Sequence, residues 1–100
     1  MGKKFVYKSY QKGNDKLLAI ADASIVGKEF SEKELQINVS DDFYHGKECN
    51  EKEVIELIKE ATIVNAVGNE IISLMISKKI AAKENILYIG KVAHAQIFTI

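Results

Sequence analysis

The residues of this chain that could most readily do chemistry lie near its C-terminal end. His94 and Gln96 are two positions apart in an apolar stretch, so in a β-strand both side chains point to the same face. There an imidazole and a carboxamide could exchange hydrogen bonds with a ligand, and His94 could also titrate near neutrality. Alternatively, neighbouring groups satisfy both side chains and the pair only fixes local geometry. His94 and Gln96 are therefore candidate binding residues, and acid–base catalysis by His94 is the enzymatic alternative.

A second cluster of reactive side chains lies in residues 41–49. Tyr44 and His45 are adjacent there, and Cys49, the single cysteine of the chain, follows shortly after. His45 and Cys49 could form a base and a nucleophile, or two ligands of a metal ion. No recognised motif surrounds them and no third group orients them, so we expect a solvated polar loop that leads into a helix. Tyr44 and His45 remain candidate binding residues, and we expect no metal and no cofactor.

Two further polar residues interrupt apolar segments. Asn65 lies in the apolar stretch 61–68, where it could cap or bridge a junction between two helices, or present its amide to a ligand near Gly68. Asp22 ends a predicted strand and is expected to form an Asx-type turn. Asn65 is therefore a further candidate binding residue, although a structural role explains it equally well.

Motifs and charge limit the classes of function. The sequence contains no G-x-x-x-x-G-K-[ST], G-x-G-x-x-G, H-E-x-x-H or G-x-S-x-G. Its 14 basic residues are all lysines and are balanced by 14 acidic residues. A neutral chain without arginine lacks the bidentate fork that favours phosphate and guanine recognition. These features disfavour the common catalytic classes and tight binding of nucleic acid, but they leave room for a local patch.

The elements that must position these residues can be read from periodicity and turn chemistry. Residues 4–10 and 16–22 are predicted to form a hairpin around the turn 11–15, which contains Gly13. An alternation of apolar and polar residues predicts a strand over 35–40. Further strands are predicted at 86–89 and 92–99, joined by a Gly90–Lys91 turn.

Two helices are predicted between these strands. Asn50 and Glu53 have the spacing of a capping box at the start of the first helix. The second is predicted to run over 63–79 and to contain Gly68, at a cost of about 1 kcal/mol. Because strands and helices are segregated, we expect an α+β two-layer sandwich: a mostly antiparallel sheet of about five strands with both helices on one face. The face that carries His94 would then be open or covered by a partner.

Size and composition indicate one domain over residues 1–100. At 100 residues and 47% hydrophobic side chains, the chain can bury one core, and it has no proline-rich or repetitive linker. Residues 1–8 lack the apolar run of a secretory signal, and the apolar stretch 71–76 is too short to cross a bilayer. We therefore expect a cytoplasmic protein without a membrane partner.

Several segments together resemble an uncharacterised archaeal domain family of about this length. They are residues 17–22, 25–28, 39–44, 61–68 with Ile-x-Asn-x-Val-Gly, and 89–96 with I-G-x-V-x-H-A-Q. The resemblance spans nearly the whole chain, and the closing motif is its most specific part. It implies a two-layer α+β sandwich, an archaeal cytoplasm and no assigned activity.

Three hypotheses for function follow. The first is a binding or accessory module that uses the sheet face around His94 and Gln96 for a protein or RNA partner, in translation or RNA metabolism. The second is a small enzyme that acts on a small molecule, with His94 as acid or base and Gln96 or Asn65 positioning the substrate. The third is a structural homodimer formed through the last strand, where Phe98 and Ile100 place apolar residues at a sheet edge.

Overall fold

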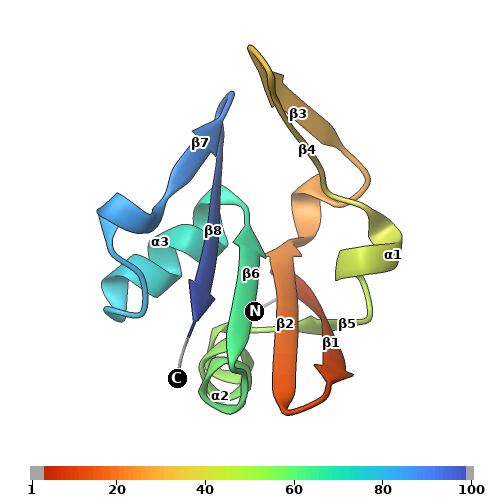
Figure 1. Ribbon diagram of the computed structural model, residues 1–100, viewed down its shortest axis with the longest axis vertical. Helices are drawn as coiled ribbons and strands as arrows, with labels where there is room; N and C mark the ends of the chain where they lie inside the picture. Colours follow the sequence, from red (N-terminus) through yellow and green to blue (C-terminus); the bar gives the residue numbers. More distant parts are fainter. Residues whose placement is uncertain (1–3, 99–100) are drawn as a thin grey trace.

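The computed structural model describes residues 4–98 and shows an α+β fold (Figure 1). The strands are β1 (Phe5–Lys12), β2 (Asp15–Asp22), β3 (Glu29–Glu32), β4 (Leu35–Asn38), β5 (Lys47–Cys49), β6 (Ile63–Val67), β7 (Leu87–Ile89) and β8 (Val92–Phe98). The helices are α1 (Asp41–Tyr44), α2 (Glu51–Glu60) and α3 (Asn69–Ser77), with the short 3-10 turns η1 (Ala23–Ile25) and η2 (Lys83–Asn85). Thr99, which the predicted last strand includes, and Ile100 lie outside the described residues.

The strands form a six-stranded sheet in the order β5-β1-β2-β6-β8-β7 and a separate two-stranded sheet of β3 and β4. Every neighbouring pair is antiparallel except β2 and β6, which are parallel. The α+β class and the mostly antiparallel sheet are therefore confirmed, with more strands than predicted. Within residues 4–98, no helix has the length and apolar character needed to cross a membrane.

The predicted hairpins and the predicted helix start are present. β1 pairs with β2 around Gly13, and β7 pairs with β8 around Gly90; both glycines have positive φ. At the start of α2, Asn50 Oδ1 accepts from the Glu53 amide at 2.9 Å, and Glu53 Oε1 accepts from the Asn50 amide at 2.9 Å. This is the predicted capping box. Local signals of turn and cap chemistry were sufficient at these places because each involves only a few consecutive residues.

The prediction of one helix over residues 63–79 is wrong in its first part. Residues Ile63–Val67 form β6, and α3 begins only at Asn69. β6 lies between β2 and β8, and Val64, Ala66 and Val67 are fully buried. A strand buried on both faces reads as a continuous apolar run, which periodicity cannot distinguish from a buried helix.

The prediction of a solvated polar loop over residues 41–49 is also wrong, because α1 and β5 lie there. Ser40 Oγ accepts from the Phe43 amide at 3.0 Å and caps the four-residue helix α1. β5 adds to the sheet by antiparallel pairing with Phe5–Tyr7 of β1. The sequence gives only a weak signal for either element, because one is a single turn and the other depends on a distant strand.

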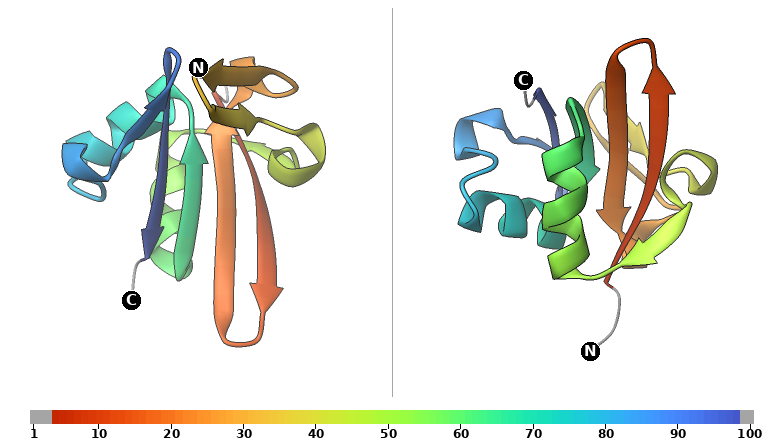
Figure 2. Two further views of the ribbon diagram at one scale, coloured as in Figure 1. Left: turned by 45° about the horizontal axis from the view of Figure 1, so that its top comes forward. Right: turned by 90° about the horizontal axis from the view of Figure 1, so that it is seen from below.

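Apolar side chains pack on both faces of the large sheet. Figure 2 shows the ribbons of α2 and α3 on one side of the sheet and that of α1 on the other. One cluster joins α2 and α3 to alternate residues of the strands, among them Leu18, Ile20 and Val64. The intervening residues, among them Ala19 and Ala21, pack in a second cluster with side chains from η1, β3, β4 and α1. The face expected to be open is therefore covered over β1 and β2, whereas Gln96 and Phe98 on β8 are exposed. α2 and α3 pack on one face of the sheet, and α1 packs on the other.

The buried carboxyl group of Asp22 joins the end of β2 to the start of α3. Its Oδ1 accepts from the Ile71 amide at 2.8 Å and its Oδ2 from the Glu70 amide at 3.0 Å, and the residue is only 5% exposed. The predicted Asx-type turn is wrong, since the side chain makes no cap bond to η1, the turn that follows it. Burial raises the pKa of Asp22, and the amide bonds from Glu70 and Ile71 oppose that rise.

Gly68, between β6 and α3, leaves the space that Asp22 occupies. Its φ is 127°, and a Cβ at this position would lie 2.6 Å from Asp22 Oδ2. A side chain at residue 68 would therefore strain the backbone and collide with the carboxyl group. The prediction that Gly68 lies inside a helix is wrong, because the glycine precedes α3 and the group that approaches it is the Asp22 side chain.

We expect Gly68→Ala to lower the free energy of unfolding by at least about 2 kcal/mol more than Gly13→Ala. Gly13 also has positive φ, but nothing lies within 4 Å of a Cβ built there, so it controls for backbone strain alone. Urea denaturation of both variants measures the difference. Equal losses would show that Asp22 does not restrict residue 68.

Candidate functional site

Two of the predicted binding residues, Tyr44 and His94, converge on the side-chain carbonyl oxygen of a third, Asn65. The Tyr44 hydroxyl donates to Asn65 Oδ1 at 2.9 Å, and His94 Nε2 lies 3.2 Å from the same oxygen. The three side chains come from α1, β6 and β8, so only the folded chain brings them together. Asn65 was expected at a junction between helices, and this expectation is wrong because residue 65 is at the centre of a strand.

Strand register places the fourth candidate, Gln96, beside this cluster. On neighbouring strands, Asn65 lies directly opposite Gln96, and Val67 lies opposite His94. The side chains of Asn65 and Val67 on β6 therefore point to the same face of the sheet as those of His94 and Gln96 on β8. Asn65 and His94 are half-buried, whereas Gln96 is exposed. We call Tyr44, Asn65, His94 and Gln96 the amide cluster, after the Asn65 carboxamide that Tyr44 and His94 both contact.

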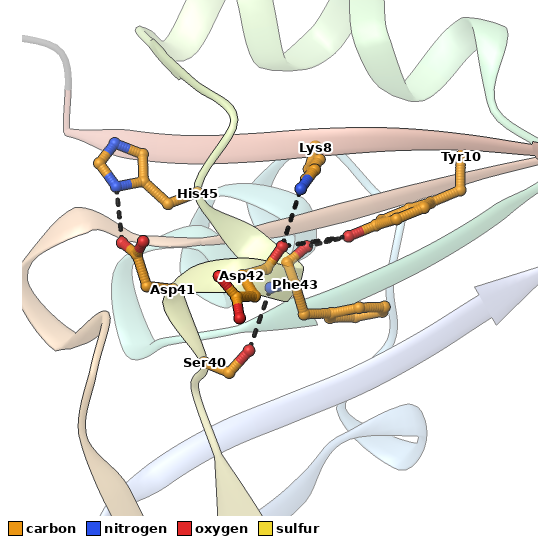
Figure 3. A network of polar contacts seen from close by, with 7 residues as sticks. All are labelled: Lys8, Tyr10, Ser40, Asp41, Asp42, Phe43 and His45. Atoms are coloured by element: carbon orange, nitrogen blue, oxygen red, sulfur yellow. Dashed lines mark hydrogen bonds and ion pairs between the residues drawn. The ribbon is translucent and has the colours of Figure 1, made fainter.

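The sequence around α1 explains why Tyr44 reaches Asn65. The Tyr10 hydroxyl donates to the Phe43 carbonyl at 2.8 Å, and the rings of Tyr10 and Phe43 stack with centroids 5.3 Å apart (Figure 3). The Phe43 ring meets Tyr44 edge to face at 4.9 Å. Lys8 Nζ donates to the Asp42 carbonyl at 3.0 Å. These contacts fix the short helix on β1 and direct the Tyr44 side chain toward β6.

Burial keeps both titratable members of the amide cluster uncharged near neutral pH. It raises the pKa of Tyr44 to about 12, with a smaller contribution from Tyr10, and it lowers the pKa of His94. A neutral His94 must carry its proton on Nε2 to bond Asn65 Oδ1, because a carbonyl oxygen only accepts. Nδ1 then has the lone pair. The cluster is therefore a neutral hydrogen-bonding group, with Nδ1 able to accept a hydrogen bond or a proton.

The fifth predicted binding residue, His45, does not join the amide cluster. Its Nδ1 lies 2.9 Å from Asp41 Oδ1, and both side chains are exposed. Figure 3 shows this pair on the side of α1 away from Tyr10 and Phe43. His45 is therefore a surface residue paired within its own helical turn, and the structure does not connect it to the other candidates.

The structure gives no support to chemistry that combines His45 with Cys49. Cys49 is 0% exposed and belongs to the core cluster under α2 and α3. Within the part of the chain that the structure describes, no three His, Cys, Asp or Glu residues lie close enough to hold a metal ion. A thiol buried in an apolar core is also a poor nucleophile, because burial disfavours the thiolate.

Two residues that the sequence does not single out shape the surroundings of the amide cluster. Asn69 donates to the Lys91 carbonyl and accepts from the Ala93 amide, both at 2.9 Å, and so holds the start of β8. Leu87 lies opposite His94 on β7 and is 46% exposed. Neither carries a local signal, since Asn69 falls inside the helix predicted over residues 63–79 and Leu87 reads as a strand residue.

We expect the pKa of His94, measured by NMR, to lie below its ordinary value of 6.5. Because the native state then resists protonation, the stability that His94 contributes is present above pH 6.5 and is lost as the pH falls. In Asn65→Asp an isosteric carboxylate would face Nε2 and raise the pKa of His94 by at least about one unit. An unchanged titration midpoint in this variant would contradict the contact between His94 and Asn65.

Comparison with known proteins agrees with this fold and assigns no activity. A crystal structure of an uncharacterized conserved protein from Methanopyrus kandleri superimposes with a TM-score of 0.76 at 24% sequence identity, over 94% of this chain and 90% of that one. No protein with curated annotation matches the chain. Residues 10–100 match the family described as "Protein of unknown function (DUF424)". The resemblance to an uncharacterised archaeal family is thus confirmed, and the chain belongs to the DUF424 family, whose function is unknown.

Proposed function

We propose that this protein is a small binding module and that its amide cluster holds an uncharged, extended segment of a partner protein. One observation carries the proposal: a tyrosine and a histidine, both neutral, converge on the carbonyl of Asn65 and fix its position beside an exposed glutamine. Such a group is arranged before any ligand arrives. Preorganisation of this kind favours binding because fewer side chains must be ordered when the partner docks.

The chemistry of the amide cluster matches a polypeptide backbone. The Gln96 carboxamide offers a carbonyl acceptor and an NH₂ donor, and His94 Nδ1 offers a further acceptor. A peptide presents N–H donors and C=O acceptors along its length. Covering neutral groups of this kind demands less desolvation than covering charged ones. Leu87, on the same face beside His94, adds an exposed apolar contact.

The electrostatics of this face favour a protein over RNA. Phosphate binding depends on lysine and arginine, and the chain has no arginine and no net charge. Lys8, on the same face of β1, directs its Nζ to the Asp42 carbonyl. A role in translation or RNA metabolism would then come through a protein partner and not through direct contact with RNA.

A second candidate function, a small enzyme, is favoured by the tautomer of His94. A histidine whose Nε2 proton is held by an amide oxygen presents Nδ1 as a general base, as in triads that use asparagine to orient the imidazole. A base also needs a reacting partner. Tyr44, the other titratable member of the amide cluster, keeps its proton near neutral pH and uses it in the bond to Asn65. We therefore rank binding above catalysis.

The proposal is tested by capture of partners from a lysate of the organism that encodes the protein. Gln96→Ala removes the exposed carboxamide and is expected to reduce the captured partner at least about tenfold, as hot-spot truncations do. Gln36→Ala, at a glutamine on β4 that is also exposed, is the matched control and should retain the partner. The captured species should be identified by mass spectrometry with and without ribonuclease treatment.

Two outcomes would contradict the proposal. Equal capture by Gln96→Ala and Gln36→Ala would show that the amide cluster is not the binding surface. Loss of capture after ribonuclease treatment would show that RNA, and not a protein, is held.

A further inference from the structure

The last strand of the sheet extends beyond its neighbour and leaves part of its edge unpaired. β7 pairs with β8 only from Val92 to His94, whereas β8 continues to Phe98. The Gly68 amide donates to the Ala93 carbonyl. Because backbone groups alternate in direction along a strand, Ala93, Ala95 and Ile97 direct their N–H and C=O groups toward β6. The backbone groups of Gln96 and Phe98 therefore point away from β6, out of the sheet. η2 contacts β8, yet no described residue bonds these groups.

This part of the edge lacks the features that usually prevent strand pairing. Exposed edges are normally protected by charged residues, proline or a bulge. β5, at the opposite edge of the sheet, carries exposed Lys47 and Glu48. β8 contains no charged residue over Val92–Phe98, and Phe98 is 64% exposed, more than any other large hydrophobic residue that the structure describes. An uncharged edge that ends in an exposed aromatic ring is suited to pairing with another strand.

We propose that β8 pairs with β8 of a second copy of this chain, antiparallel and across a two-fold axis at Ile97. In this register Gln96 lies opposite Phe98 of the second copy, and Phe98 lies opposite its Gln96. Both residues direct their backbone groups outward, so each pair exchanges N–H to C=O bonds and every unpartnered group described above is satisfied. The Phe98 ring of one copy then packs on the aliphatic part of Gln96 in the other.

A second copy fits this edge better than an unrelated strand because the arrangement is self-complementary. The two-fold register uses the same outward groups on both sides and closes after two copies, so it does not propagate into fibres. A chain with zero net charge has no long-range repulsion from its own copy. The interface uses the backbone edge, Phe98 and the aliphatic part of Gln96, whereas the proposed function uses the Gln96 carboxamide and side chains on the sheet face. Self-association is measured without any partner protein, so failure of the dimer and failure of the proposed function are distinguishable.

Analytical ultracentrifugation over a range of concentrations tests the pairing. The wild-type mass should rise from 11.2 kDa toward twice that value. Phe98→Lys removes the ring that packs on Gln96 of the second copy and places two like charges diagonally across the two-fold axis, so it should raise the dissociation constant at least about tenfold. Leu35→Lys, at a residue of β4 that is 45% exposed, is the matched control and should dimerise as the wild type does. Circular dichroism should show both variants folded.

Hydrogen exchange identifies which atoms form the interface. In the dimer, the amides of Gln96 and Phe98 should exchange more slowly as the protein concentration rises, while exposed amides of β3 and β4 should not change. A wild-type mass that stays at 11.2 kDa at every concentration would overturn the proposal. Equal dissociation constants for Phe98→Lys and Leu35→Lys, or a dimer whose Gln96 and Phe98 amides gain no protection, would also overturn it.

Discussion

The carboxyl group of Asp22 is the constraint on which the centre of this fold depends. It is buried at the end of β2, where it binds the first amides of α3, and it occupies the space that a side chain at residue 68 would need. Because β2 and β6 are parallel, their C-terminal ends lie side by side. The turn from β6 into α3 therefore meets the end of β2. One polar group thus joins two strands and a helix whose residues are distant in sequence. Its acceptor bonds also satisfy helical amides that would otherwise lack partners.

The position of β6 that follows from this junction creates the amide cluster. β6 lies between β2 and β8 with its side chains covered on both faces, so a polar residue within it must find partners inside the protein. Asn65 finds them in Tyr44 and His94. The residue beside Asn65 on β2 is Ala19, whose small side chain leaves room for α1 to approach the sheet. The exposed side of the cluster begins at Gln96, where this cover ends.

Local sequence signals predicted the parts of the fold that depend on adjacent residues. The two hairpins and the capping box of α2 were found because glycine turns and cap spacings act over a few positions. The run Ile63–Val67 was assigned to a helix because a short apolar segment carries no period that separates a buried strand from a buried helix. Its β-branched residues were the signal that could have decided the case.

The candidate site was predictable in its residue types and not in its arrangement. His94, Gln96 and Asn65 stood out as polar residues in apolar segments, and the structure places them on one face. That Tyr44 completes the cluster while the adjacent His45 turns to Asp41 depends on how α1 docks on β1. Docking of this kind is set by the Tyr10 and Phe43 contact between distant segments, which no spacing rule within one segment can reveal.

The most direct test of the Asp22 junction compares Asp22→Ala with Asp15→Ala at the other end of the same strand. Asp15 is exposed, and its only side-chain bond to a described residue is a 3.3 Å contact with the Thr62 hydroxyl. Asp22→Ala should lower the free energy of unfolding by about 1–3 kcal/mol, because it leaves the Glu70 and Ile71 amides unsatisfied. Asp15→Ala should change it by less than about 0.5 kcal/mol. Equal and small losses, measured by urea denaturation, would contradict the central role assigned to Asp22.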